Sequence, residues 1–225
     1  MIPLNKRSPF SIDHDWRFEP TLLENDVAGN APIRVSQETR AMKAIGRIGI
    51  IGSVQISRLF GFKRHHIRRM IQDKKLVQHQ LVKNKNAIPV FTIGPRAGKL
   101  LSLSYEHNKW RTWTVEQILR KLVFFQLCCA LHDKQKAFQI DNAAFPFTGK
   151  LEIGQDIRQV LVIRKKLEKL DEEIRHNTLP IIVIAESFDH VQPYNHLLGS
   201  AKLLLDEDLG KDYRFYIWKK DEWVR

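Results

Sequence analysis

Three short amphipathic segments in the first third of the chain constrain the fold more than any other feature. Apolar residues recur at helical spacing in residues 38–51, in the segment that begins at Ser53, and in residues 63–75. We therefore predict three helices, the second with Ser53 as its N-cap. Gly61 stands where the second helix should end, because glycine accepts the left-handed backbone of a break.

A predicted β-hairpin follows the third helix. Two strand-like segments, Val77–Val82 and Ala87–Ile93, are joined by Lys83-Asn84-Lys85-Asn86, and asparagine tolerates the left-handed backbone of a tight turn. Helix, helix, turn, helix and hairpin is the order of a winged helix-turn-helix. We expect that domain over residues 36–105.

The rest of the chain predicts an α+β protein with further parts. Residues 1–35 are polar and interrupted by prolines, which predicts a flexible arm anchored by Trp16 and Phe18. Residues 106–135 predict a connecting helix over Thr114–His132 with a broad apolar face. Residues 136–225 alternate strand-like and helical segments and predict an α/β domain. Its expected strands are Ala137–Ile140, Lys150–Ile153, Val160–Ile163, Pro180–Ala185, Lys202–Leu205 and Tyr213–Trp218, with helices at Lys165–His176 and Asp189–Leu198.

Positive charge is concentrated in one part of the sequence. The chain has a formal net charge of +12, and residues 36–105 carry fourteen Lys and Arg against only Glu38 and Asp73. A concentration of this kind favours a polyanion partner, because each neutralised phosphate releases condensed counterions. No apolar run approaches the ~18 residues of a membrane span, and the first residues lack the apolar stretch of a signal peptide. We expect a cytoplasmic protein without a membrane partner.

The third predicted helix carries the candidate DNA-binding residues. Its apolar positions Ile67, Met70 and Ile71 are expected to face the core, which leaves the cationic side chains on the outer face. Arginine on such a face can grip guanine in the major groove. Lysines at the tip of the hairpin would meet phosphates or the minor groove. The predicted contacts to double-stranded DNA are Arg58, Lys63, Arg64, His65, Arg68, Arg69, Lys83 and Lys85.

One segment resembles a known family. Residues Val90–Leu101 read VFTIGPRAGKLL, with a strand followed by a Gly-Pro-x-x-Gly turn into a helix. This resembles the plasmid replication-relaxation family, whose members continue with a long helix and a degenerate restriction-endonuclease-like domain. Ile140–Ala144 and Lys150–Ile153 look like the acidic-strand hairpin of that domain. The resemblance implies a role in replication or copy control of a plasmid or other mobile element.

The sequence supports a catalytic function less well than DNA binding. A nuclease of this kind needs two acids and a lysine around Mg²⁺, and Asp141, Glu152 and Lys150 are the candidates. Gly154 stands where the lysine of an acid-x-Lys motif belongs, so we expect no enzyme, cofactor or metal. Cys128 and Cys129 are adjacent, too few for a zinc site, and are expected in the core.

The sequence is compatible with several functions. The first is a DNA-binding protein that acts in replication, with a transcriptional regulator and a Mg²⁺-dependent nuclease as alternatives. A further alternative is an adaptor whose α/β domain binds a replication or transfer protein. Because DNA-binding proteins commonly read two-fold sites as dimers, Thr114–His132 is the candidate element of a homodimer.

Overall fold

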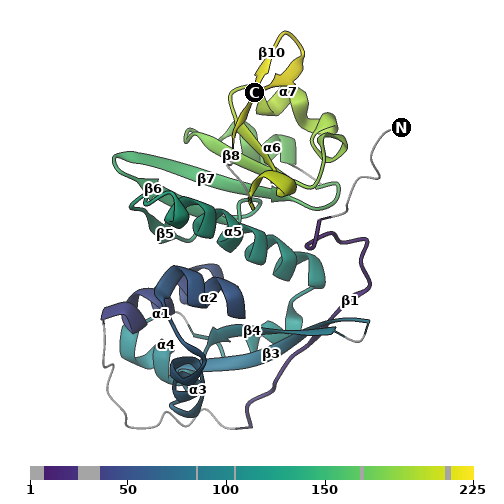
Figure 1. Cartoon of the computed structure of the whole chain (residues 1–225). Coiled ribbons are helices and arrows are strands. Elements are labelled where there is room, and N and C mark those ends of the chain that lie inside the picture. The colour runs from purple at the N-terminus through teal and green to yellow at the C-terminus, as the bar shows by residue number, and fades with distance from the viewer. Residues whose placement is uncertain (1–7, 25–35, 85, 104, 168–169, 211–213) are drawn as a thin grey trace. The chain divides into compact units, whose positions relative to one another are not determined.

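The structure, a computed structural model, divides the chain into two compact units (Figure 1). It describes residues 8–24, 36–84, 86–103, 105–167, 170–210 and 214–225. Residues 15–129 contain twenty Lys and Arg against eight Asp and Glu and are called the basic unit. Residues 1–14 and 130–225 contain seventeen of each and are called the sheet unit. Each unit mixes helices and strands, so the predicted α+β class is confirmed.

The basic unit combines helices with a small antiparallel sheet. Its helices are α1 (Ser36–Ile48), α2 (Ser53–Phe60), α3 (Arg64–Gln72), α4 (Pro95–Leu101), the 3-10 helix Lys109–Thr112, and most of α5 (Val115–Asp133). Its strands are β1 (Trp16–Glu19), β2 (Ile51–Gly52), β3 (Leu76–Lys83) and β4 (Asn86–Ile93), in the order β1-β3-β4-β2. The long hairpin β3–β4 pairs from Leu76↔Ile93 to Lys83↔Asn86, as the alternating sequence predicts.

Helices α1, α2 and α3 form because each buries one apolar stripe. Met42, Ile56 and Met70, one from each helix, are at most 1% exposed. The break between α2 and α3 is confirmed at Gly61, whose φ of 66° is the left-handed conformation that glycine adopts without strain. Of the three apolar positions assigned to the inner face of the third helix, Ile71 is only partly buried.

Two details at the start of α2 were predicted wrongly. The first helix ends at Ile48 and not at residue 51, because Ile51 and Gly52 pair with β4 as strand β2. The N-cap of α2 is Gly52 and not Ser53. Gly52 has no side chain to cap with, but the Gln55 side chain forms the other half of a capping box by accepting a 3.0 Å hydrogen bond from the Gly52 amide.

Part of the predicted arm is an ordered strand. β1 lies antiparallel to β3, with Trp16 opposite Lys83 and Phe18 opposite Leu81. The chain beyond β1 stays attached, because the Thr21 amide donates a 3.0 Å hydrogen bond to His79 Nδ1. Composition alone could not show this strand, because a four-residue edge strand depends on the partner that it pairs with. The remaining arm residues 1–7 and 25–35 lie outside the described residues.

The sheet unit is built on seven strands in the order β11-β10-β9-β8-β7-β6-β5. Strands β7, β8 and β9 are parallel to one another, and every other pairing is antiparallel. The bounds are β5 (Gln139–Asp141), β6 (Gly149–Ile153), β7 (Asp156–Ile163), β8 (Ile181–Ala185), β9 (Lys202–Leu205), β10 (Tyr216–Lys219) and β11 (Glu222–Val224), with helices α6 (Leu170–Arg175) and α7 (Asn195–Leu198).

The predicted order of elements in this unit is confirmed, with three differences. The helix expected over Lys165–His176 is shorter, because α6 covers only Leu170–Arg175. The expected helix Asp189–Leu198 is broken into 3-10 turns at Phe188–His190 and Gln192–Tyr194 before α7, because Pro193 removes a backbone donor. Strand β11 was not predicted. One face of the sheet packs Leu161, Val183 and Leu203 against residues of α6 and α7 in a single apolar core.

Helix α5 is buried over most of its surface. Ile118, Leu122 and Phe125 are at most 2% exposed within the single chain. Cys128 and Cys129 are fully buried free thiols, as expected, and burial raises the pKa of Cys128. Among the described residues, no helix is long and apolar enough to span a membrane. Dimerisation through α5 stays a prediction.

Candidate nucleic-acid interface

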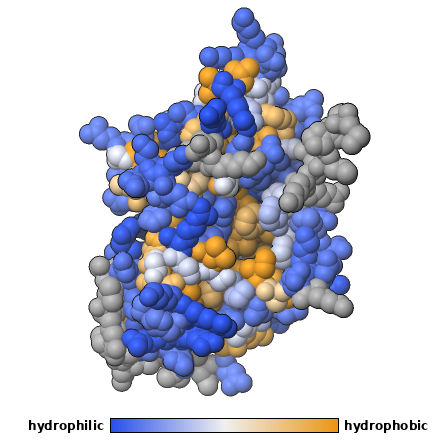
Figure 2. Space-filling model, in the orientation of Figure 1, coloured by the Kyte–Doolittle hydropathy of each residue, from blue (hydrophilic) through white to orange (hydrophobic). Residues whose placement is uncertain are grey.

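The outer face of α3 carries an unbroken group of polar and cationic side chains. Arg64, His65, His66, Arg68 and Arg69 are all exposed, and so is Lys63 at the N-cap. In contrast, Ile67 is 7% and Met70 is 1% exposed, which fixes the rotation of the helix on the core. In Figure 2 the surface in the region of α3 is hydrophilic. Helical spacing thus places the cations on one surface, as the sequence predicts.

The two acids of residues 36–105 are bound to a buried lysine. Lys75 is fully buried, and its Nζ lies 2.8 Å from Glu38 Oε2 and 3.3 Å from Asp73 Oδ2. A buried ammonium group needs such partners, because desolvation of an isolated charge is costly. Neither carboxylate stands on α3, whose nine residues include no acid. The cations of α3 therefore have no counter-charge on their own helix.

The electrostatics of α3 show the effect of this crowding. The rings of His65 and His66 lie 4.1 Å apart between centroids. The pKa of His65 is lowered, first by His66, then by desolvation, and further by Lys63 and Arg69. The neutral form of His65 is thus favoured beside fixed cations. An anion bound at this face would raise the pKa of His65 again.

The other predicted contacts lie at the edge of α2 and on the hairpin. Arg58 is exposed in the last turn of α2. Lys83, at the end of β3, is half-buried, and its Nζ lies 5.5 Å from the centre of the Trp16 ring. Asn84 has the φ of 54° that the predicted turn requires. Lys85 lies outside the described residues. Trp16 was assigned only to anchoring the arm, because its strand was not recognised.

The Gly-Pro-x-x-Gly segment has a packing role. The Gly94 amide donates a 2.8 Å hydrogen bond to the carbonyl oxygen of Lys75, and a Cβ at position 94 would lie 2.2 Å from the Lys74 carbonyl oxygen. Pro95 occupies the first turn of α4, where its missing N–H costs nothing. The segment holds α4 against the junction of α3 and β3. Gly94, Pro95 and Gly98 are all buried, so the segment acts through packing.

The three nuclease candidates share one face of the sheet unit. Asp141 on β5 lies directly opposite Lys150 on β6, and Glu152 lies two residues further along β6. Residues opposite one another, and residues two apart, point to the same face. Asp141 and Glu152 are exposed. Among the described residues, no three His, Cys, Asp or Glu side chains are grouped as a metal ion would need.

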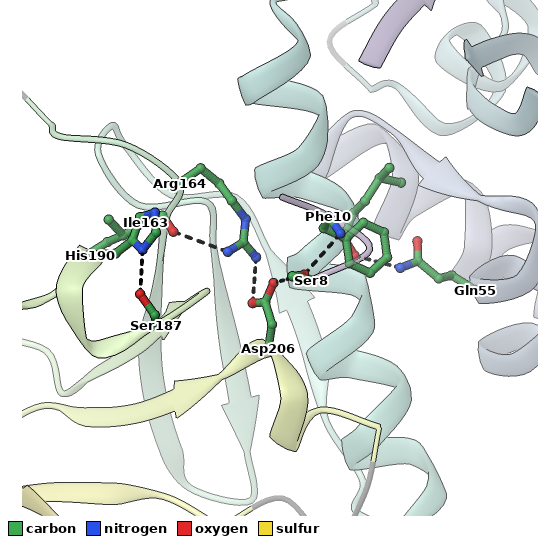
Figure 3. Close-up of polar contacts among 9 residues, drawn as sticks. Ser8, Phe10, Gln55, Ile163, Arg164, Ser187, His190 and Asp206 are labelled. Atoms are coloured by element: carbon green, nitrogen blue, oxygen red, sulfur yellow. Dashed lines mark hydrogen bonds and ion pairs between the residues drawn. The ribbon is translucent and has the colours of Figure 1, made fainter. Parts of the chain in front are cut away.

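Sequence reasoning missed a polar cluster at the carboxyl ends of the parallel strands (Figure 3). Arg164, directly after β7, is fully buried and donates a 2.8 Å hydrogen bond to Asp206, directly after β9. The Ser8 hydroxyl also donates to Asp206. Nearby, Ser187 Oγ lies 3.0 Å from His190 Nδ1. In the described chain no carboxylate is hydrogen-bonded to His190, so the pair lacks the orienting acid of a nucleophilic triad.

Comparison with known proteins finds no match to any family profile, any curated protein or any solved structure.

Proposed function

We propose that the basic unit is a winged helix and that the protein binds double-stranded DNA through it. Helices α1, α2 and α3, followed by the hairpin β3–β4, have the order and connections of that fold. In this proposal α3 is the recognition helix and β3–β4 is the wing. Strand β1 pairs with the outer edge of β3, so the wing belongs to a four-stranded sheet in the order β1-β3-β4-β2.

The exposed cationic face of α3 is the observation that carries the proposal. Arg64, Arg68 and Arg69 point away from the core on a helix without a single acid. A solvated surface helix normally mixes both signs of charge, because opposite charges at i,i+4 stabilise it. A helix that forgoes this stabilisation and concentrates cations fits a phosphate backbone and the acceptor edges of guanine.

The proposed contacts are of two kinds: some position the protein on the DNA backbone, and others read the base sequence. Lys63, Arg58 and the wing lysine Lys83 would bind phosphates, which fixes the register of α3 on the duplex without reading its sequence. Arg64 and Arg68, one turn apart on α3, would then reach guanine O6 and N7 in the major groove. The proposed contacts need no cofactor.

The biological role rests on the resemblance to the plasmid replication-relaxation family. From it we propose a cytoplasmic protein that acts in replication, or its control, of a plasmid or mobile element. A transcriptional regulator would use the same contacts and differ only in where its site lies. The sheet unit, which we propose to be a degenerate restriction-endonuclease-like domain, would then contact a replication or transfer protein or a second copy of the chain.

Selection from a random duplex library tests the proposal. Wild-type protein should enrich a motif, and the variant Arg64→Ala/Arg68→Ala should lose it while its fold, measured by circular dichroism, is unchanged. Steeply salt-dependent binding without a motif would favour the adaptor, in which the winged helix only tethers the protein to DNA. Absence of binding by the wild type at low salt would contradict the proposal.

A Mg²⁺-dependent nuclease is the second candidate, favoured by the shared face of Asp141, Lys150 and Glu152. It predicts nicking of supercoiled plasmid that requires Mg²⁺ and is lost in Asp141→Asn. Glu116→Gln, which alters a half-buried acid outside the sheet unit, is the control. Intact plasmid in the presence of bound protein and Mg²⁺ would exclude this candidate.

A further inference from the structure

The sheet unit contains a pocket of about 390 Å³ between its C-terminal hairpin and the 3-10 turns before α7. One wall is the hairpin β10–β11, which contributes Trp218, Asp221, Glu222 and Trp223. Phe188 and Asp189 stand in the opposite wall. Its volume lies in the range of pockets that bind small ligands or single side chains.

The hairpin holds two indole rings in a fixed arrangement. Lys220 and Asp221 both have positive φ, as a two-residue turn with φ positive at both central positions requires, and this turn sets Trp218 opposite Trp223. The two rings lie 5.2 Å apart at 64° to one another. Trp223 is anchored by a 2.9 Å hydrogen bond from its Nε1 to Asn195 Oδ1. The aromatic wall is therefore preorganised and needs no ligand to assemble it.

The chemistry of the lining is that of a cation site. Three carboxylates, those of Asp189, Asp221 and Glu222, stand among three aromatic rings, and the lining includes no Lys or Arg. Within the described part of the chain, none of these carboxylates takes part in an ion pair. Aromatic faces attract cations through their quadrupole, and nearby carboxylates add direct charge attraction. These carboxylates would repel an anionic ligand, and an apolar ligand would gain nothing from their charge.

We propose that this pocket binds an arginine or lysine side chain from a basic segment of a partner protein. Trp218 and Trp223 would contact the aliphatic stem and the face of the cation, and Asp189 and Glu222 would accept its hydrogen bonds. The site lies wholly within the sheet unit, far in sequence from the cationic helix α3. It therefore does not depend on the proposed DNA binding.

Nuclear magnetic resonance of the full-length protein with ¹⁵N-labelled indoles tests the proposal. The probes are acetyl-Gly-Arg-Gly-amide and acetyl-Gly-Lys-Gly-amide, with acetyl-Gly-norleucine-Gly-amide as the uncharged control of similar length. We expect both cationic peptides to shift the Trp218 and Trp223 signals saturably, with dissociation constants on the order of 1 mM. The Trp113 signal, from the other unit, should not move.

Two variants separate charge from shape. Asp189→Asn/Glu222→Gln, at exposed positions, should weaken binding of the arginine peptide at least about tenfold. Trp218→Leu, which keeps an apolar side chain, should abolish the shift of Trp223 by that peptide. Equal shifts with the norleucine peptide, or unchanged affinity in the double variant, would overturn the proposal. DNA binding by these variants should equal that of the wild type.

Discussion

Lys75, Arg164 and His79 are three of the buried polar side chains among the described residues, and each has specific partners. Lys75 has two carboxylates, Arg164 has Asp206, and His79 lies between Thr21 and Thr92. His79 Nδ1 accepts a hydrogen bond from the Thr21 amide, so its Nε2 carries the proton and donates to Thr92 Oγ1 at 2.9 Å. These residues hold distant parts of the sequence together.

The burial of His79 predicts acid sensitivity of the basic unit. Burial lowers the pKa of His79 to about 4, below its unfolded value of 6.5, so the unfolded state binds more protons between these values. The free energy of unfolding should therefore have its full value above about pH 6.5. It should fall by about 3 kcal/mol as the pH drops to about 4. Urea unfolding across this range, followed by tryptophan fluorescence, measures the loss.

The matched variants isolate this histidine. His79→Gln should remove most of the pH dependence between about pH 7.5 and pH 5.5, where carboxylates contribute little. His132→Gln, at an exposed position of α5, should retain it. An identical pH dependence in His79→Gln and the wild type would show that His79 is not the titrating group.

Lys75 should be essential to stability although it was predicted only as the end of a helix. Lys75→Met leaves Glu38 and Asp73 as poorly solvated carboxylates without their cation, so we expect a loss of about 3–5 kcal/mol in the free energy of unfolding. Lys43→Met at an exposed site of α1 should change it by no more than about 0.5 kcal/mol. Chemical denaturation measures the free energy of unfolding of both variants. Equal stability of Lys75→Met and Lys43→Met would contradict this role of Lys75.

The residues of α3 could be assigned from sequence, whereas the role of Lys75 could not. The exposure of Arg64 and Arg68 follows from helical spacing against Ile67 and Met70, which is local information. The burial of Lys75 depends on Glu38, thirty-seven residues earlier, and lysine is almost never fully buried without a partner. Pairing across such a distance leaves no periodic signal.

At the scale of elements, strands with a local sequence pattern were predicted, and strands that depend on distant pairing were missed. β3 and β4 were predictable because an alternating pattern and a turn of asparagines lie next to one another in sequence. β1, β2 and β11 have two to four residues each and exist only through pairing with other strands. The helix predicted over residues 189–198 was divided because Pro193 interrupts it.

Helix α3 should couple DNA binding to proton uptake. Phosphates at this face would offset the cations that lower the pKa of His65, so the bound state should hold more protons than the free state. Affinity should therefore rise several-fold as pH falls from about 7.5 to about 6. Fluorescence anisotropy with a labelled duplex measures this, and His65→Gln/His66→Gln should flatten the profile. A profile unchanged in that variant would remove these histidines from the interface.

The hairpin should contribute phosphate contacts and little sequence reading. Lys83→Ala should weaken binding similarly on all duplexes and lower the slope of log affinity against log salt by about 0.9, the value of one phosphate contact. Lys99→Ala, exposed on α4, is the control and should leave the slope unchanged. If the two variants give equal slopes, the hairpin does not contact the backbone.

At the scale of the whole molecule, charge separates the two units. The basic unit contains the entire excess of twelve positive charges, and the sheet unit contains equal numbers of acids and bases. Long-range attraction to a polyanion therefore belongs to the basic unit, and the sheet unit is free to take partners of other chemistry. The charge distribution was visible in the sequence. The cation pocket was not, because β11 and the turn before it were not recognised.

The most direct test of the proposed DNA binding compares two variants that lose the same charge. Arg64→Ala/Arg68→Ala removes two cations from α3, and Arg40→Ala/Lys43→Ala removes two exposed cations from α1 in the same unit. Anisotropy with a labelled duplex at several salt concentrations should show a loss of about tenfold or more for the α3 variant. The α1 variant should bind nearly as the wild type does. Equal losses in both variants would mean that net charge alone attracts DNA, and would contradict α3 as the recognition helix.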